Sequence, residues 1–255
     1  MTDKIMEIDN NKSVISIKNL AKSFDDNSVL KNLNLELKKG ETKSILGKSG
    51  SGKSVLLKII IGLIPPDEGE IIVLGKKISD LEYKELLKMR QKVGFIFQSG
   101  ALYDSMTVRE NLEFPLIKHL NLKQEEIDKK VKEILDKVEL KDAIEKMPSE
   151  LSGGMRKRVG VARALILKPE IMLWDEPTTG LDPETSHDIS ELIVKTQKDF
   201  NVSSIVITHD IPTVKTVAGK ISVLKDGHFL AEGTFDELKD SEEEFVKSFF
   251  KYNLV

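Results

Sequence analysis

The chain has 255 residues, enough for one α/β domain or two small lobes but not for a string of domains. Its formal net charge is -3, so it has no net basic field to hold nucleic acid by neutralising phosphates, and we expect no nucleic-acid partner. Cysteine is absent, which excludes disulfides, thiol nucleophiles and cysteine zinc sites together.

The sequence shows no segment that would insert into a membrane by itself. Its first residues include the acidic Asp3 and no long apolar stretch, so we expect no secretory signal. The apolar run at 59–64 is far shorter than the roughly 20 residues that a membrane helix needs. We therefore expect a cytoplasmic chain whose contact with a membrane comes through a partner.

In the first part of the chain, residue spacing predicts strands and a helix around a glycine-rich loop. Apolar and polar residues alternate at 33–38, which is typical of a half-buried strand. Residues 42–46 form a short strand that runs into the glycine-rich stretch 47–52, and residues 53–61 have helical spacing. A turn then leads into the apolar segment 71–74.

The middle of the chain has helical spacing with little strand signal. The acids and lysines at 124–133 form the solvated side of an amphipathic helix. Its apolar face carries Ile127, Val131, Ile134, Leu135 and Val138. We therefore predict a helical lobe at about 100–166.

Strand signals return in the last third of the chain. Residues 171–174 and 204–208 are apolar runs that lead into polar residues. Such runs suit buried parallel strands whose C-terminal ends deliver functional groups. Residues 225–228 predict a hairpin turn between the apolar segments 221–224 and 229–231.

Residues 47–54 match the pattern G-x-x-x-x-G-K-S/T of a phosphate-binding loop. The glycines let backbone N–H groups approach phosphate oxygens, and the following helix adds its positive N-terminal end. In this pattern Lys53 reaches the β- and γ-phosphates and the Ser54 hydroxyl ligates Mg²⁺. A chance match is expected in about 1% of chains of this length, and the loop lies between a predicted strand and a predicted helix, as the motif requires.

Two further segments carry chemistry. The apolar strand at 171–174 ends in Asp175 and Glu176, which suit a metal ligand and a group that orients the attacking water. The sequence Ser-Gly-Gly at 152–154 opens a basic helical stretch and forms a second nest for an anion. Taken alone, the acids at 175–176 could be a strand meeting an acidic turn, and the sequence at 152–154 could be an ordinary helix cap.

The ordered motifs resemble those of the ATP-binding cassette (ABC) ATPases, and the resemblance covers nearly the whole chain. In chain order the motifs are the Walker A loop at 47–54, the Q-loop Gln98, the signature at 151–155, the end of Walker B at 173–176, the D-loop at 180–182 and the H-loop His209. The resemblance implies an α/β P-loop NTPase fold with a RecA-like core, an antiparallel β subdomain and a helical subdomain. It places one ATPase domain at 1–255, with the helical subdomain at about 100–166 and the rest of the domain at about 1–99 and 167–255.

The family motifs also imply which residues form the site. Contacts to ATP fall on Phe24, Gly47, Ser49, Gly50, Ser51, Gly52, Lys53, Ser54, Val55, Ser152, Gly153, Gly154 and Asp182. Contacts to Mg²⁺ fall on Ser54, Gln98 and Asp175, and catalytic roles fall on Lys53, Gln98, Glu176 and His209. By the same resemblance Phe24 stacks on adenine, Gln98 also senses the membrane subunit, and His209 holds the γ-phosphate. Taken singly, Phe24 could be a core residue, and Gln98 and His209 could merely end strands.

In this family two cassettes dimerise head to tail, and the signature of one caps the ATP bound to the Walker A loop of the other. The resemblance therefore implies a second copy of the chain and a transmembrane permease as partners. It places the chain peripherally, at the cytoplasmic face of the inner (cell) membrane. The segment 99–108 is predicted to form the groove that receives a permease helix.

A narrower resemblance is to the ATPases of Mla/Mce-type phospholipid transporters, which implies an Mce-type lipid-binding subunit as a further partner. It rests on the residues around Gln98 and on Val55 and Met155, where cassettes in general carry Thr and Gln. ATPases of polar amino-acid uptake remain an alternative. A non-transport cassette ATPase is a second one, although only one motif set is present and no long coiled coil separates the Walker motifs.

The last residues leave one further partner open. The sequence ends at Val255, without the longer extension that in enterobacterial Mla systems helps to dock a STAS-domain subunit. An apolar patch at helical spacing precedes this end and consists of Phe245, Val246, Phe249 and Phe250. The patch either packs onto its own domain or forms a partner surface.

Overall fold

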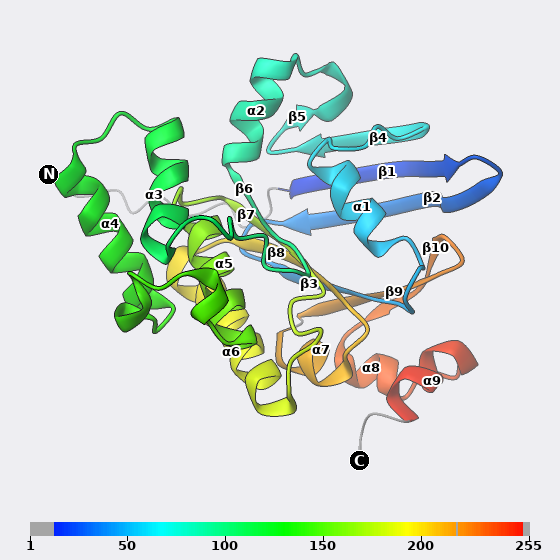
Figure 1. Cartoon of the computed structure of the whole chain (residues 1–255). Coiled ribbons are helices and arrows are strands. Elements are labelled where there is room, and N and C mark those ends of the chain that lie inside the picture. Colours follow the sequence, from blue (N-terminus) through cyan, green and yellow to red (C-terminus); the bar gives the residue numbers. More distant parts are fainter. Residues whose placement is uncertain (1–12, 218, 252–255) are drawn as a thin grey trace, which may run out of the picture.

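The structure, a computed structural model, describes residues 13–217 and 219–251 (Figure 1). The N-terminal residues, for which we expect no secretory signal, and the end at Val255 lie outside the described residues. Two sheets form the framework, and helices cover them. This architecture confirms the predicted α/β fold with a separate antiparallel sheet.

The first sheet is antiparallel and has the strand order β2-β1-β4-β5. Its strands are β1 (Ser13–Phe24), β2 (Asn27–Lys38), β4 (Glu68–Val73) and β5 (Lys76–Lys77). In β2 the side chains of Leu33, Leu35 and Leu37 are buried while the polar residues between them are exposed. The alternation at 33–38 therefore predicted this strand and its buried face correctly.

The second sheet has six strands in the order β10-β9-β3-β8-β7-β6. They are β3 (Thr42–Leu46), β6 (Val93–Ile96), β7 (Ile171–Asp175), β8 (Ser203–Thr208), β9 (Lys220–Lys225) and β10 (His228–Gly233). Neighbours from β9 to β6 run parallel, and β10 closes one edge as the antiparallel half of the predicted hairpin. This order sets the C-terminal ends of β3, β8 and β7 side by side.

Nine α-helices and three short 3-10 turns connect the strands in the described part of the chain. The helices are α1 (Lys53–Ile60), α2 (Tyr83–Gln91), α3 (Val108–His119), α4 (Gln124–Lys137), α5 (Gly153–Leu165), α6 (Pro183–Phe200), α7 (Ile211–Val217), α8 (Phe235–Lys239) and α9 (Glu244–Lys251). The 3-10 turns are η1 (Ile78–Asp80), η2 (Lys141–Ala143) and η3 (Pro148–Glu150). Helices α3 and α4 lie on the far side of the molecule from the antiparallel sheet (Figure 1). The lobe boundaries near 99 and 166 remain a prediction.

The six-stranded sheet separates two large apolar cores. In β7, Met172 and Trp174 belong to the core that includes α3, α4 and α5, whereas Ile171 and Leu173 belong to the core that includes α1 and the antiparallel sheet. Alternation along a strand covered on both faces explains why its sequence is apolar throughout. The amphipathic helix predicted in the middle of the chain is α4, and the five apolar residues of its predicted face are all buried.

The apolar patch near the C-terminus packs onto its own domain. Val246, Phe249 and Phe250 of α9 are buried in a third core with residues of α7, α8 and β9. The rings of Phe235 and Phe250 meet edge to face at 5.3 Å between centroids. Within residues 13–217 and 219–251, no helix has the length and apolarity to span a membrane.

We expect Phe250→Ala to lower the free energy of unfolding by about 3–5 kcal/mol, because a buried aromatic side chain is deleted and a cavity remains. The control is Tyr83→Ala, since the Tyr83 side chain is 71% exposed and buries little. Urea denaturation of the two variants measures the difference. Equal stabilities would show that α9 does not pack on the domain.

Candidate functional site

The glycine-rich loop at 47–52 joins the end of β3 to the start of α1. Gly52 caps the helix with a φ of 98°, a left-handed conformation that glycine adopts without strain. At Gly47 a Cβ atom would lie 2.7 Å from Ser51 Oγ and 2.9 Å from the carbonyl oxygen of Leu224. A residue with a side chain would therefore displace the loop at both positions.

Lys53 is buried beneath this loop and makes three polar contacts. Its Nζ donates to the carbonyl oxygens of Gly47 at 2.7 Å and Lys48 at 3.0 Å. It also lies 3.3 Å from Glu176 Oε1. The ammonium group thus links the loop after β3 to the residue that follows β7.

Ser54 and Asp175, the predicted metal ligands on facing elements, contact each other directly. Ser54 Oγ donates to Asp175 Oδ1 at 2.8 Å. Burial raises the pKa of the Asp175 carboxyl, and the hydrogen bond from Ser54 opposes that shift. A buried carboxylate beside a hydroxyl fits a divalent cation, which prefers oxygen ligands and would offset the desolvated charge.

The protein supplies only part of such a coordination sphere. No group of three or more histidine, cysteine, aspartate or glutamate side chains suited to a metal occurs in the described ranges 13–217 and 219–251. Mg²⁺ commonly keeps several waters and binds through one or two carboxylates together with substrate phosphates. The donor set of Ser54 and Asp175 therefore fits Mg²⁺ that arrives with a nucleotide.

Glu176 lies between Lys53 and His209. Its Oε2 is 2.9 Å from His209 Nδ1 and accepts a hydrogen bond from Thr179 Oγ1 at 3.3 Å. Its backbone has a φ of 49°, which is sparsely populated for a residue with a side chain, and its N–H donates to the carbonyl of Ile207 at 3.0 Å. The backbone hydrogen bond to β8 thus fixes Glu176 in a strained backbone conformation, with its carboxylate between the Lys53 ammonium group and the His209 ring.

Gln98 enters the site from the segment after β6. Its backbone carbonyl oxygen accepts a 2.6 Å hydrogen bond from Nζ of Lys157, a buried residue of α5. Burial lowers the pKa of Lys157, and the negative charges of Asp175 and Glu176 oppose that shift. Gln98 is exposed toward the cavity that the loop lines.

A cavity of about 330 Å³ collects most of the predicted site residues. Its lining includes Ser49, Gly50, Gly52, Lys53, Ser54, Val55, Gln98, Glu176 and His209. Asp175 and Gly47 adjoin it through their contacts with Ser54 and Lys53. Phe24 is not part of the lining, is 42% exposed, and has the Lys22 ammonium 5.2 Å from its ring centroid. Adenine stacking on Phe24 therefore stays a prediction.

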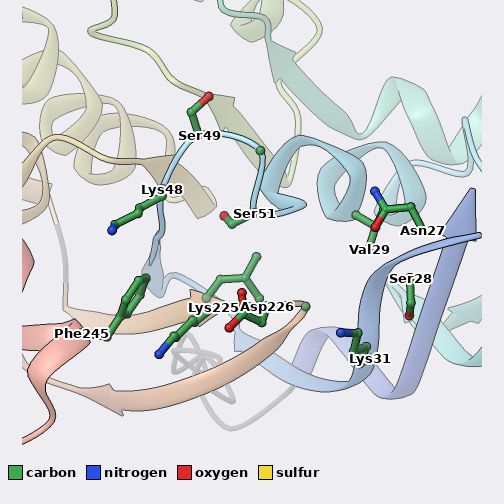
Figure 2. Close-up of a pocket in the computed structure, with 13 residues that line it drawn as sticks. Asn27, Ser28, Val29, Lys31, Lys48, Ser49, Ser51, Lys225, Asp226 and Phe245 are labelled. Atoms are coloured by element: carbon green, nitrogen blue, oxygen red, sulfur yellow. The ribbon is translucent and has the colours of Figure 1, made fainter.

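A second cavity of about 430 Å³ lies against the same loop (Figure 2). It shares Ser49, Gly50 and Val29 with the first cavity and is also lined by Ser51. Lys48 points toward Phe245 of α9, and the Lys48 and Lys225 ammonium groups lie 5.2 Å and 4.7 Å from that ring's centroid. Helix α9 therefore contacts the phosphate-binding loop from outside.

The signature residues form a separate group. Ser152 caps α5 by accepting a hydrogen bond from the N–H of Met155 at 3.3 Å. A Cβ atom at Gly154 would lie 2.5 Å from a methyl group of Thr185, and Asp182 caps α6 through Thr185. Neither Asp182 nor any residue of the nest at 152–154 lines the cavity at Lys53.

Three residues at this site were not predicted from the sequence: Val29 and Thr179, which line the cavity, and Lys157, which contacts Gln98. The contact of Thr179 with Glu176 could not be predicted from the sequence, because a threonine after a strand occurs in many structural roles. Lys157 had a usable signal, because it shares the helix face of the buried residues Gly154 and Val161. A lysine on a buried face needs a specific partner.

Comparison with known proteins places these features in a family. The sequence pattern of the ABC transporter family matches residues 30–179, more than half of the chain. The intermembrane phospholipid transport system ATP-binding protein MlaF of Haemophilus influenzae is 39% identical over 94% of this chain and 91% of its own length. The methionine import ATP-binding protein MetN of Carboxydothermus hydrogenoformans is 41% identical over 88% of this chain and 67% of its own.

A probable ribonucleotide transport ATP-binding protein, Mkl of Mycobacterium leprae, is 40% identical over 92% of this chain and 68% of its own length. Among solved structures, a dimer of the bacterial ABC transporter cassette MJ0796 is similar with a TM-score of 0.80 and 39% identity. That match covers 86% of this chain and 98% of the cassette. The relatives thus share the fold and differ in the substrates that their names give.

We expect Asp175→Asn to raise the free energy of unfolding at pH 7 in the absence of metal and nucleotide. An acid whose pKa is raised by folding holds its proton in the native state above pH 3.8, where the unfolded chain has lost it. The free energy of unfolding therefore falls as the pH rises from 3.8 to above the raised pKa of Asp175 in the folded state. Asparagine does not titrate, so the variant does not lose this stability. Urea denaturation in EDTA measures the effect.

The matched control is Asp67→Asn, for which the opposite sign is expected. The Lys22 hydrogen bond, together with the Ser23 N–H, lowers the pKa of Asp67, so its charged form stabilises the native state above pH 3.8. A loss of stability in Asp175→Asn would contradict the prediction, because the hydrogen bond from Ser54 would then outweigh the desolvation.

Proposed function

The chain belongs to the ABC transporter family, and from this membership we propose that it hydrolyses ATP to drive a phospholipid transporter of the Mla/Mce type. Its activity as an ABC-type ATPase that powers transport follows from the family. The observation that carries the site assignment is the contact of Glu176 with both Lys53 and His209 at one wall of the cavity. A phosphate-binding loop, a buried cation and a carboxylate beside a histidine are the groups that phosphoryl transfer to water needs.

ATP binding exchanges the partners of Lys53. In the structure the ammonium group contacts two loop carbonyls and Glu176. Phosphate oxygens carry more charge than a carbonyl and lie within reach of the loop's N–H groups. Lys53 therefore turns to the β- and γ-phosphates, and Glu176 becomes free to accept a hydrogen bond from water.

Glu176 then orients a water molecule toward the γ-phosphate and takes up a proton from it. The water oxygen bonds to the γ-phosphorus while the bond from that phosphorus to the bridging oxygen of the β-phosphate breaks, so that inorganic phosphate and ADP leave. His209 Nδ1 lies 2.9 Å from the carboxylate and would keep it in place, which leaves the other ring nitrogen to contact the γ-phosphate. Mg²⁺ bound with ATP would be held by Ser54 and Asp175 with Gln98, and it would neutralise charge on the phosphates. Lys53 stabilises the charge that develops on the equatorial oxygens.

The nest at 152–154 supports a dimer in which each site is shared. None of its residues lines the cavity at Lys53, which favours a role at a nucleotide held by another copy. In a head-to-tail pair the nest of one copy faces the γ-phosphate of the other, with Asp182 at the junction. The similarity to the dimeric cassette MJ0796, which in one structure is bound to ADP and Pi in a post-hydrolysis state, supports this arrangement.

The permease would bind near the segment 99–108, at the cytoplasmic face of the membrane. Exposed large apolar side chains accompany this segment and include Phe97 and Tyr103. Their exposure favours a partner surface over core packing. The chain would thus attach peripherally, and lipid would not need to touch it.

Phospholipid is the proposed cargo because the residues that depart from general cassettes agree with the Mla/Mce subgroup. Met155 follows the two glycines of the signature, and Val55 lines the cavity. The similarity to MlaF over 94% of this chain points the same way. An Mce-type lipid-binding subunit, with a STAS-domain subunit as a further candidate, would complete the complex. Import of an amino acid is the second candidate, supported by the similarity to MetN.

We expect Glu176→Gln to keep the affinity for ATP, to reduce turnover by about 10²–10³-fold and to trap a dimer with Mg-ATP. The amide keeps the shape of the side chain but cannot accept the proton of the attacking water. Size-exclusion chromatography with ATP measures the dimer, and phosphate release measures turnover. A monomer under these conditions would contradict the shared site.

Lys53→Ala is the matched variant, because it removes the ammonium group and leaves Glu176 in place. It should abolish ATP binding and the trapped dimer together. Near-normal ATP affinity in Lys53→Ala would refute the assignment of the phosphate-binding loop.

If the cargo is phospholipid, specific proteins should co-purify with the chain from membranes. An affinity-tagged copy should co-purify with a permease and a single-pass lipid-binding subunit, and phospholipid should be detected in the purified complex by mass spectrometry. The Lys53→Ala variant controls for contacts that need no nucleotide. Co-purification with a soluble substrate-binding protein for amino acids would favour the alternative.

A further inference from the structure

Lys157 is unusual among the buried lysines of the described chain. Lys22, Lys43 and Lys53 each lie within 4 Å of a carboxylate, at Asp67, Glu232 and Glu176 respectively. Among residues 13–217 and 219–251, no carboxylate lies within that distance of Lys157, which is only 6% exposed and donates to the backbone carbonyl of Gln98. A buried ammonium group without a counter-ion in contact is costly, so this single hydrogen bond matters more than a surface one would.

The segment that begins with Gln98 lies along one face of α5. Besides Lys157, two arginines of α5 hold it: Arg163 donates to the carbonyl of Ala101, and its guanidinium lies 4.4 Å from the ring centroid of Tyr103. Arg156 pairs with Asp104 at 3.0 Å. Arg156 and Arg163 lie on one face because their separation is close to two helical turns, whereas Lys157 lies about 100° further round the helix, on its buried side.

Between these contacts the two backbones touch. A Cβ atom at Gly160 would lie 2.9 Å from the carbonyl oxygen of Gly100, closer than real Cβ atoms approach a backbone oxygen. Gly100 itself has a φ of 79°. The loop therefore sits on α5 through a glycine contact at its centre and a basic side chain on each side.

Helix α5 also begins with the nest that the proposed dimer presents to the partner's nucleotide. Lys157 lies one turn after Gly153, where the helix starts, so Gln98 and the nest at 152–154 share one rigid element. A shift of the Gln98 backbone is thus transmitted to the first turn of α5. The negative charges of Asp175 and Glu176 also act on Lys157 from the end of β7.

We propose that Lys157 is a positioning residue for ATP hydrolysis, which holds the Gln98 backbone on α5 and so couples a chain's own nucleotide site to the nest that serves its partner's. This role rests on the proposed function as a dimeric ATPase. Lys157 touches neither nucleotide; it acts through Gln98 on one side and through the start of α5 on the other.

The main test is Lys157→Met in the full-length chain, because methionine has a similar length and tolerates burial. We expect kcat for ATP to fall about tenfold or more and ATP affinity to change less than about twofold, since the binding loop is untouched. The Hill coefficient for ATP should fall toward 1. Arg158→Met is the matched control, because Arg158 is the next cation of the same helix and contacts Glu139 and Asp188 instead.

A double-mutant cycle separates positioning from general destabilisation. If Lys157 acts through Gln98, then Lys157→Met combined with Gln98→Ala should be no slower than Gln98→Ala alone, within about twofold. Gly160→Ala supplies a second variant that keeps all charges and improves helix propensity. It should push the loop off α5 and lower kcat while the chain stays folded at the assay temperature, which its thermal unfolding curve checks.

The outcomes separate this inference from the proposed function. If the wild-type chain hydrolyses ATP and Lys157→Met matches Arg158→Met, the inference is overturned and the ATPase assignment stands. Additive losses in the double variant would likewise overturn it, because Lys157 would then act apart from Gln98. If the wild-type chain hydrolyses no ATP, both fall. A tenfold loss in kcat, absent from Arg158→Met and not additive with Gln98→Ala, supports it.

Discussion

The ion pair between Lys53 and Glu176, 3.3 Å apart, is the interaction on which the site depends. Lys53 is the first residue of α1, directly after the loop that follows β3, and Glu176 belongs to the turn after β7; β8 lies between these two strands. The pair is thus possible only because the parallel order brings three strand ends to one edge. In the proposed cycle this contact must break when the phosphates of ATP bind. The ion pair thus links two elements of the fold, and its rupture is the first step of the reaction.

Charge that is buried at this edge is stabilised by partners on different elements. Asp175 has the Ser54 hydroxyl, Glu176 has Lys53, His209 and Thr179, and Lys157 has the Gln98 carbonyl. Burial makes each of these groups less stable when charged and unpaired. Glu176 also has a backbone φ of 49°, a sparsely populated conformation of the kind that clusters at functional sites.

The contact between α5 and the segment after β6 gives the helical part of the chain a mechanical connection to the site. Lys157 and Arg163 of α5 both donate hydrogen bonds to backbone carbonyls of that segment, and Gly160 allows the backbones to meet. Because α5 carries the signature nest at its first turn, this helix would link the two nucleotides of the proposed dimer. Such a link needs bistable packing rather than a flexible loop.

The sequence by itself determined the local parts: the loop at 47–54, the strands at 42–46 and 171–174, the amphipathic helix α4 and the acids after β7. These follow from spacing and from residue types whose conformations are restricted within a few neighbours. Only the tertiary structure decided that Glu176 meets His209 across 33 positions, and that Lys157 within a basic run is buried against Gln98. Strand order and the packing of α5 set these pairings. They depend on the competition between distant segments for the same core, which no local pattern records.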